Sequence, residues 1–234
     1  MKDVIAFDIW GDYAHFKKYF TTTSPLTFSL PPRTVLMGII GAICGLNKEQ
    51  YIEAFTRDRA DIAVSILNPI KKFRIAENLI DTKTAQFMGR IKNRTQIKLE
   101  FIKDPRYRIF VSLQDAHLHS SFKEMLLAHK CVYTPYLGIS ELIANFRYIN
   151  EYHAERKMTD ECINIVSAVN NDLVRYLNIE TNKEYFSEVM PNDMERQRIV
   201  NSYSKIIYER NGQNISATVT ECFEVGRGEH ITFL

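Results

Sequence analysis

The 234 residues have a formal net charge of +2, and 45 % of them are hydrophobic and 25 % charged. This composition is that of an average globular protein, and it excludes a disordered tail, a collagen and a coiled coil. The longest uncharged apolar run, residues 35–46, is shorter than the roughly 20 residues of a membrane span. Four cysteines without a CxxC spacing suit a reducing cytosol. We therefore expect a soluble, cytoplasmic protein without a membrane contact, metal or cofactor.

The first 145 residues predict a β-α-β-β-α-β order. Hydrophobic and proline patterns predict, in chain order, a strand at 4–10, an ordered loop at 11–30, a helix at 33–46, strands at 61–68 and 107–113, a helix at 122–129, and a strand into a turn at 131–138. Glycines at helical spacing in the first helix indicate close packing on a sheet. The order is that of a ferredoxin-like (RRM-like) domain over 1–145, with an insertion at about 71–106.

The elements predicted after residue 145 are all strands. Strand-like runs follow at 146–152, 163–169, 185–190 and 199–208. Asn211-Gly212 lies between two alternating runs, 203–209 and 215–221, which is the strongest short signal for a hairpin. The expected fold class is therefore α+β, with a mostly antiparallel, β-rich C-terminal part over 146–234.

Positive charge is concentrated in one segment. Residues 71–108 hold eleven basic and four acidic residues, whereas the rest of the chain has a net charge of −5. Apolar side chains lie among these charges, and residues 96–101 alternate as a β-ribbon does. Basic groups beside aromatic ones suit phosphate contacts and base stacking, so we interpret the segment as a nucleic-acid contact. The alternative is an ordinary solvated face.

Two histidine motifs are candidates for chemistry. His117 and His119 follow Asp115 and would share a metal ion if the segment were extended, but a polar loop leading into a helix is the simpler interpretation. His15, with Lys17, Lys18 or Tyr13, has the residue types for metal-free RNA cleavage. Packing, or RNA binding without cleavage, are the alternatives for His15. No Walker A, GxSxG, HExxH or RRM aromatic signature is present.

Several blocks of the chain resemble a known family. They are WGDYAHFK at 10–17, SPLTF at 24–28, PPRTVLMGIIG at 31–41, RTQ at 94–96, YRIFV at 107–111 and YTPYLGISE at 133–141. Over residues 3–145 the chain is similar to the CRISPR-associated Cas-five family of the RAMP superfamily, and most similar to its type I-B branch.

The resemblance implies a subunit of Cascade, the RNA-guided complex that recognises target DNA. Such subunits cap the 5′ handle of the CRISPR RNA and join the large subunit to the first backbone subunit. A basic β-ribbon, the thumb, is inserted in their ferredoxin-like core and folds over the guide. In the type I-C branch, a tyrosine, a lysine and a histidine cut the repeat, but that trio cannot be placed on this sequence.

We expect an RNA-binding subunit that is not an enzyme. The alternatives are a metal-independent CRISPR-repeat endoribonuclease and a stand-alone nucleic-acid-binding protein. Helix N-termini attract phosphate, so the predicted handle contacts gather around the start of the first helix and the later tyrosine block. They are Tyr13, His15, Phe16, Lys17, Lys18, Arg33, Thr34, Tyr136 and Gly138. The predicted thumb contacts are Phe87, Met88, Arg90, Lys92, Arg94, Thr95 and Gln96.

Overall fold

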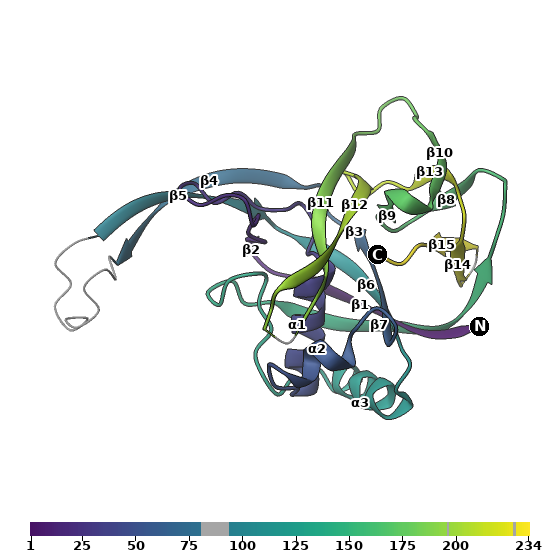
Figure 1. Cartoon of the computed structure of the whole chain (residues 1–234), viewed down its shortest axis with the longest axis horizontal. Coiled ribbons are helices and arrows are strands. Elements are labelled where there is room, and N and C mark those ends of the chain that lie inside the picture. The colour runs from purple at the N-terminus through teal and green to yellow at the C-terminus, as the bar shows by residue number, and fades with distance from the viewer. Residues whose placement is uncertain (81–93, 196, 227) are drawn as a thin grey trace.

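The computed structural model describes residues 1–80, 94–195, 197–226 and 228–234, which form an α+β body with one projecting hairpin (Figure 1). The first elements are β1 (Lys2–Trp10), β2 (Tyr13–Ala14), α1 (Arg33–Cys44), α2 (Gln50–Ala54), β3 (Ala60–Ile66), β4 (Lys71–Ile80), β5 (Arg94–Lys103), β6 (Arg106–Leu113) and α3 (Ala116–Leu127). The others are β7 (Asn145–Lys157), β8 (Ile163–Ile165), β9 (Val169–Asn170), η2 (Asn171–Leu173), β10 (Val174–Asn178), β11 (Tyr185–Met194), β12 (Val200–Glu209), β13 (Ile215–Val219), β14 (Cys222–Val225) and β15 (Glu229–Ile231). In the described residues, no helix is long and apolar enough to cross a membrane.

The N-terminal half has the predicted β-α-β-β-α-β topology. Strands β7, β1, β6 and β3 lie side by side in that order and are antiparallel throughout. Helices α1 and α3 pack on one face of this sheet, where Phe7 of β1 meets Phe122 of α3 edge to face at 5.5 Å. Numbered along the chain with β4 and β5 set aside, the strand order is 4-1-3-2, which confirms the ferredoxin-like prediction.

The fourth strand of this unit is β7, so the prediction of a strand at 131–138 is wrong. Residues 131–138 are tied instead to the end of α1, where the Val132 and Tyr133 N–H groups donate to the carbonyls of Ile43 and Ala42. Because these N–H groups are bonded to carbonyls at a helix terminus, they are not available for hydrogen bonds in a sheet. Strand β7 pairs with the whole of β1 and, at its far end, with β14. It therefore joins the two parts of the chain.

Helix α1 begins where predicted and packs on the sheet, but its glycines face other neighbours than their spacing indicated. It begins at Arg33, directly after Pro32, and ends at Gly45, whose φ of 77° is left-handed. A Cβ on Gly41 would lie 2.7 Å from Cβ of Tyr51 in α2, and one on Gly45 would lie 2.7 Å from Val132. These glycines therefore admit α2 and the 131–138 segment close to α1, and not a sheet as the spacing indicated.

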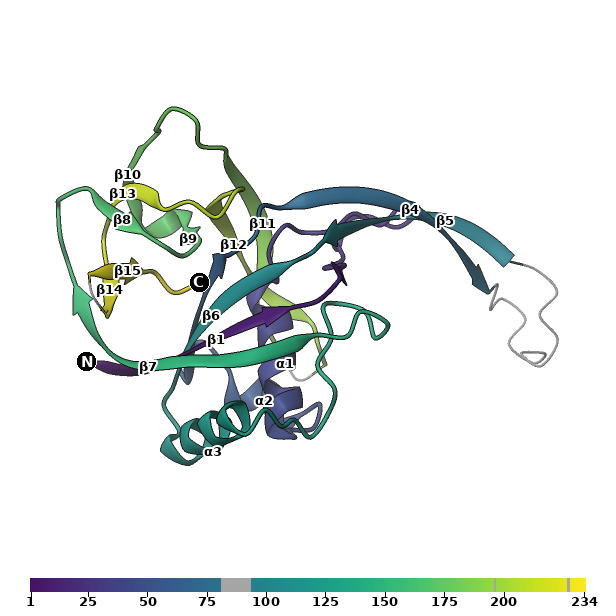
Figure 2. The same cartoon turned by 180° about the vertical axis from the view of Figure 1, so that it is seen from behind.

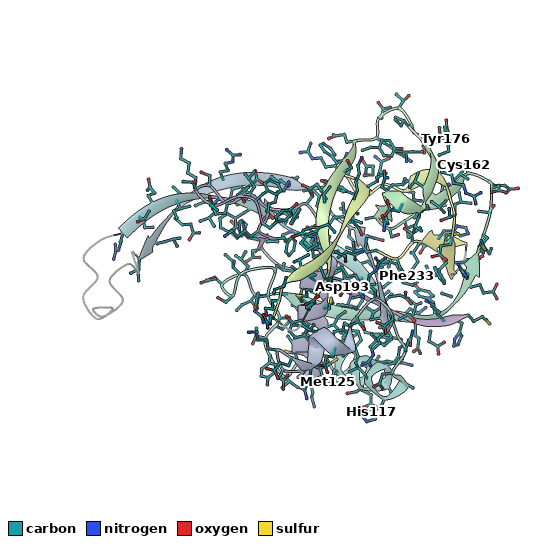
Figure 3. The ribbon with its side chains drawn as sticks, in the orientation of Figure 1. His117, Met125, Cys162, Tyr176, Asp193 and Phe233 are labelled. Carbon is teal, nitrogen blue, oxygen red and sulfur yellow. The ribbon has the colours of Figure 1, made fainter. Side chains whose placement is uncertain are left out.

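Helix α3 starts six residues earlier than predicted. Asp115 caps it by accepting hydrogen bonds from the N–H groups of His117 and Leu118. The alternating histidines thus lie on a helix and not on an extended segment. His119 contacts Glu151 of β7 at 2.7 Å, whereas His117 lies at the outer surface of α3 (Figure 3). In the part of the chain that the structure describes, no three metal-ligating side chains gather.

The C-terminal part extends the first sheet and adds a second one. Beyond β7 the sheet continues through β14, β15, β8, β13 and β10, and a second core of apolar side chains lies against it. Strands β11, β12 and β9 form a separate antiparallel sheet, from which Met190 and Met194 reach the main core beside α1. The antiparallel, β-rich prediction is confirmed, with one parallel pair between β15 and β8.

Asn211-Gly212 does not form the predicted hairpin. Strand β12 pairs with β11 and β9, whereas β13 pairs with β10 and β8, so the two strands that flank this turn belong to different sheets. The buried carboxylate of Glu209 holds the turn by accepting from the N–H groups of Asn211 and Gln213. The turn signal was therefore correct, but the strands that flank the turn pair with other strands and not with each other.

Strands β4 and β5 form the predicted basic insertion. They pair over ten residues, from Lys71 opposite Lys103 to Ile80 opposite Arg94, and project from the body as one curved hairpin (Figures 1 and 2). The short strand β2 pairs with β5 at its root. We call β4 and β5 the hairpin. Phe87, Met88, Arg90 and Lys92 lie outside the described residues.

Candidate nucleic-acid interface

A hollow of about 550 Å³ lies along α1, between this helix and the loop at residues 133–138. Thr34 of the first helical turn lines one side, and Tyr133 and Tyr136 line the other. Both tyrosines are about half exposed, so their rings are accessible from solvent. Lys48 and Arg198, both exposed, add positive charge to the lining. The hollow therefore combines aromatic faces with cationic groups.

The glycine of the 133–138 loop fixes the position of the loop. Gly138 has a φ of 102°, and a Cβ on it would lie 1.9 Å from the carbonyl oxygen of His15. The His15 N–H donates to the carbonyl oxygen of Leu137 at 3.0 Å. The loop is thus pressed against the segment at 13–16. Of the predicted site residues, Thr34, Tyr136 and Gly138 are brought together in the hollow, although about one hundred residues separate the first from the others.

His15 does not face this hollow. Its side chain is only 2 % exposed, and its Nδ1 donates to the carbonyl oxygen of Glu100 at 2.7 Å. Phe16 is also buried, and its ring lies 6.2 Å from that of Tyr107. The prediction that His15 and Phe16 contact RNA is therefore wrong, because both belong to the core. The packing alternative for His15 is the one that the structure supports.

Arg33 is also buried and not a phosphate ligand. It is 2 % exposed, and its guanidinium donates to the carbonyls of Phe55, Ala60 and Asn192 at 2.9, 2.7 and 3.2 Å. Burial lowers the pKa of Arg33 to about 10, although nearby Asp193 acts in the opposite direction. The sequence prediction for Arg33 is wrong because the side chain ties the start of α1 to three other segments.

The root of the hairpin carries an aromatic cluster. The Tyr13 ring lies 5.4 Å from Phe73 of β4 and 6.4 Å from Phe101 of β5, and Tyr13 remains partly exposed. Lys17 is exposed in the following segment. Aromatic rings at such distances form a surface on which a base can stack. Tyr13 and Lys17 are therefore accessible from solvent, and their contact with RNA stays a prediction.

A buried carboxylate fixes the hairpin root to the body. Glu188 of β11 accepts from Lys18 at 2.6 Å and from the Ser29 N–H at 2.9 Å, and Lys72 of β4 lies 3.6 Å away. Burial alone would raise the pKa of Glu188, but Lys72, Lys18 and the Ser29 N–H together hold it below its ordinary value. Burial lowers the pKa of Lys72, against the attraction of Glu188. Lys18 is thus committed to an internal pair.

The two faces of the hairpin differ in chemistry. Strand register places Phe73 opposite Phe101 and Ile75 opposite Leu99 on one face. The other face presents mostly polar and charged side chains, which are Lys72, Arg74, Asn78, Arg94, Gln96, Lys98 and Glu100. Arg94, Thr95 and Gln96 are all exposed, with Thr95 on the apolar face, so these three predicted contacts are accessible.

Sequence reasoning missed the residues that connect distant segments. Glu188, Asp193 and Asn192 lie in β11, more than one hundred and fifty residues from the Lys18 and Arg33 side chains that they meet. No local pattern marks such partners. Tyr133 carries a signal that could have been used, because it shares the tyrosine block of Tyr136.

The model of a family described as CRISPR-associated protein (Cas_Cas5) matches residues 4–205. The chain belongs to this family. The resemblance of the sequence blocks to this family is thus confirmed, and the match extends well past residue 145 into the β-rich part. Among curated proteins, no significantly similar sequence was found.

Two solved structures share the fold of this Cas_Cas5 chain. A CRISPR protein from Archaeoglobus fulgidus is 14 % identical, with a TM-score of 0.57 over 97 % of both chains. A chain of a CRISPR RNA-guided surveillance complex is 12 % identical, with a TM-score of 0.56 over 96 % of this chain and 95 % of that chain. At these identities the likeness concerns the arrangement of the elements alone.

Proposed function

We propose that this chain is a non-catalytic subunit of a type I Cascade complex, of the I-B branch, that caps the 5′ handle of the CRISPR RNA. The observation that carries the proposal is the hollow, which gathers Thr34, Tyr136 and Gly138 in a chain of the Cas_Cas5 family. In the complex, the subunit bridges the large subunit and a backbone subunit, meets target DNA through the guide, and acts in the cytoplasm.

The chemistry of the hollow suits a handle of single-stranded RNA. A volume of about 550 Å³ is within the range of small-ligand pockets. Tyr133 and Tyr136 offer rings for base stacking, while Lys48 and Arg198 offer charge to phosphates. The segment at 13–16 links the loop of the hollow to the hairpin root. An RNA bound in the hollow can therefore continue toward the hairpin root, where Tyr13 and Lys17 are exposed.

Burial of His15 favours binding without cleavage. General acid–base catalysis needs a proton-transfer group within reach of the substrate. His15 is enclosed, and its Nδ1 is engaged by the Glu100 carbonyl. His119 is engaged by Glu151, and Asp115 by the start of α3. These contacts support a structural role for the motifs that were candidates for chemistry.

The handle site is tested by Tyr136→Ala. One base–aromatic stack contributes about 1–3 kcal/mol, so we expect roughly tenfold weaker binding of repeat-derived handle RNA in a fluorescence-anisotropy titration. Tyr176→Ala is the matched control, because Tyr176 is an exposed tyrosine of β10, outside the hollow. Equal affinities of the two variants would contradict the proposal that the hollow holds the handle.

A further inference from the structure

The face of the first sheet that points away from α1 and α3 is divided in two. The half that contains the N-terminal end of β1 is apolar, because Val4 and Ala6 of β1 pack there against Phe223 and Val225 of the C-terminal strands. The half that contains Asp8 and Trp10 is polar, and the side chains of Arg106, Arg108 and Arg147 are partly exposed there. Figure 2 shows β7, β1 and β6 side by side.

Strand register places charged groups in one row across this polar half of the face. Arg108 of β6 lies opposite Ser65 of β3 on one side and opposite Asp8 of β1 on the other. Asp8 in turn lies opposite Arg147 of β7. The next row holds Trp10 opposite Arg106. Strands β1, β6 and β7 therefore bring three arginines around one aspartate.

The three arginines carry more positive charge than the single carboxylate of Asp8 neutralises. Asp8 is fully buried, and its carboxylate lies 2.8 Å from Arg108, 3.4 Å from Arg106 and 3.6 Å from Arg147. The hydrogen bond from Arg108 raises the pKa of that guanidinium. One such pair neutralises the carboxylate, so Asp8 and the three arginines together keep a net charge of +2, and the carboxylate of Glu229 also acts on Arg108. Arg147 is 60 % exposed at its side chain, and an ion pair at that distance and exposure stabilises little.

An aromatic ring adjoins these cations. The guanidinium carbon of Arg106 lies 5.6 Å from the centre of the Trp10 ring, and Trp10 is partly exposed. Stacked arginine and aromatic planes form a flat surface of the kind that accepts a base, while guanidinium forks bind phosphate. Arg106 is only three residues beyond the last residue of β5, so this surface begins at the hairpin root.

We propose that the arginine–tryptophan face, formed by Trp10, Arg106, Arg108 and Arg147, binds the phosphodiester backbone of a single nucleic-acid strand. The inference rests on the proposed function and extends it by a second contact surface, which is separate from the hollow. Asp8 acts as the positioning residue, because it holds Arg108 and Arg106 in place without cancelling the charge. Guide RNA and a strand of target DNA share this chemistry.

Trp10 makes the proposal directly measurable, because it is the single tryptophan of the chain. The probes are oligouridine and the matching oligodeoxythymidine, which lack any handle sequence. We expect each to change the Trp10 emission saturably, and the tighter of the two identifies guide RNA or target DNA as the natural strand. Arg147→Ala should weaken binding roughly tenfold and reduce the magnitude of the salt slope by about 0.7.

Two further variants complete the test. Arg147→Lys keeps the charge and should retain the salt slope, while Arg175→Ala removes an exposed arginine of β10, paired with Asp160, and should leave binding unchanged. Unchanged oligouridine and oligodeoxythymidine affinity and salt slope in Arg147→Ala would overturn the inference. Failure of the proposed function has a different readout, which is equal binding of handle RNA and oligouridine by the wild-type chain.

Discussion

Glu188→Gln is expected to lower the free energy of unfolding by about 2–3 kcal/mol, because it leaves Lys18 and Lys72 without their shared carboxylate. Breaking a fully buried ion pair costs about 3–5 kcal/mol. The loss expected here is smaller, because the Lys72 side chain keeps 27 % exposure. Urea denaturation monitored by circular dichroism measures it. Glu184→Ala is the control, because Glu184 pairs with Arg210 at the surface and should contribute only about 0.5 kcal/mol.

The same carboxylate predicts an acid dependence of stability. The folded-state pKa of Glu188 is lower than the ordinary value of 4.5, so its contribution is fully present above that value. It is lost as the pH falls through the folded-state pKa. Glu188→Gln should therefore show a shallower loss of stability below about pH 4.5 than the wild type. An acid dependence identical in the two proteins would contradict this role of Glu188.

Gly138→Ala is the second change with a large expected effect. Its Cβ would lie 1.9 Å from the carbonyl oxygen of His15 and 2.7 Å from the carbonyl carbon, and the backbone φ of 102° is strained for any side chain. We expect a loss of about 3 kcal/mol or more, together with weaker binding of handle RNA, because the loop that carries Tyr136 must move away from the 13–16 segment.

Gly228 provides a control that separates the clash from the strain. Its φ is 79°, but a Cβ there meets no described atom within 4 Å. Gly228→Ala should therefore cost only about 1 kcal/mol and leave RNA binding unchanged. Urea denaturation and anisotropy titrations compare the two variants. If Gly138→Ala were no more destabilising than Gly228→Ala, the close approach of the loop to His15 would not hold.

Local patterns predicted those elements whose structure depends on neighbours in the sequence. The β-branched and aromatic run that became β1, the proline-opened start of α1 and the basic hairpin all follow from local composition and period. The start of α3 was missed because the capping role of Asp115 was not recognised. Capping signals of this kind are readable in the sequence, so that error was avoidable.

The remaining errors concern partners that are far apart along the chain. Asn211-Gly212 indicated a hairpin, but pairing of β12 with β11 and of β13 with β10 depends on the whole C-terminal packing. Arg33 resembled a phosphate ligand because its position at a helix start is favourable, yet it donates to three carbonyls in the interior. Sequence alone places a charge near a helix end but does not say which side of the helix is buried.

The central claim, that this chain holds the handle of a CRISPR RNA without cutting it, is tested most directly by one titration. Purified chain is incubated in EDTA with labelled repeat RNA that either contains or lacks the handle, and both bound fraction and RNA length are measured. We predict that the RNA stays intact and that loss of the handle weakens binding at least tenfold, as expected for the loss of one or more base stacks. Cleavage by the wild-type chain, or equal affinity for the two RNAs, would contradict the account.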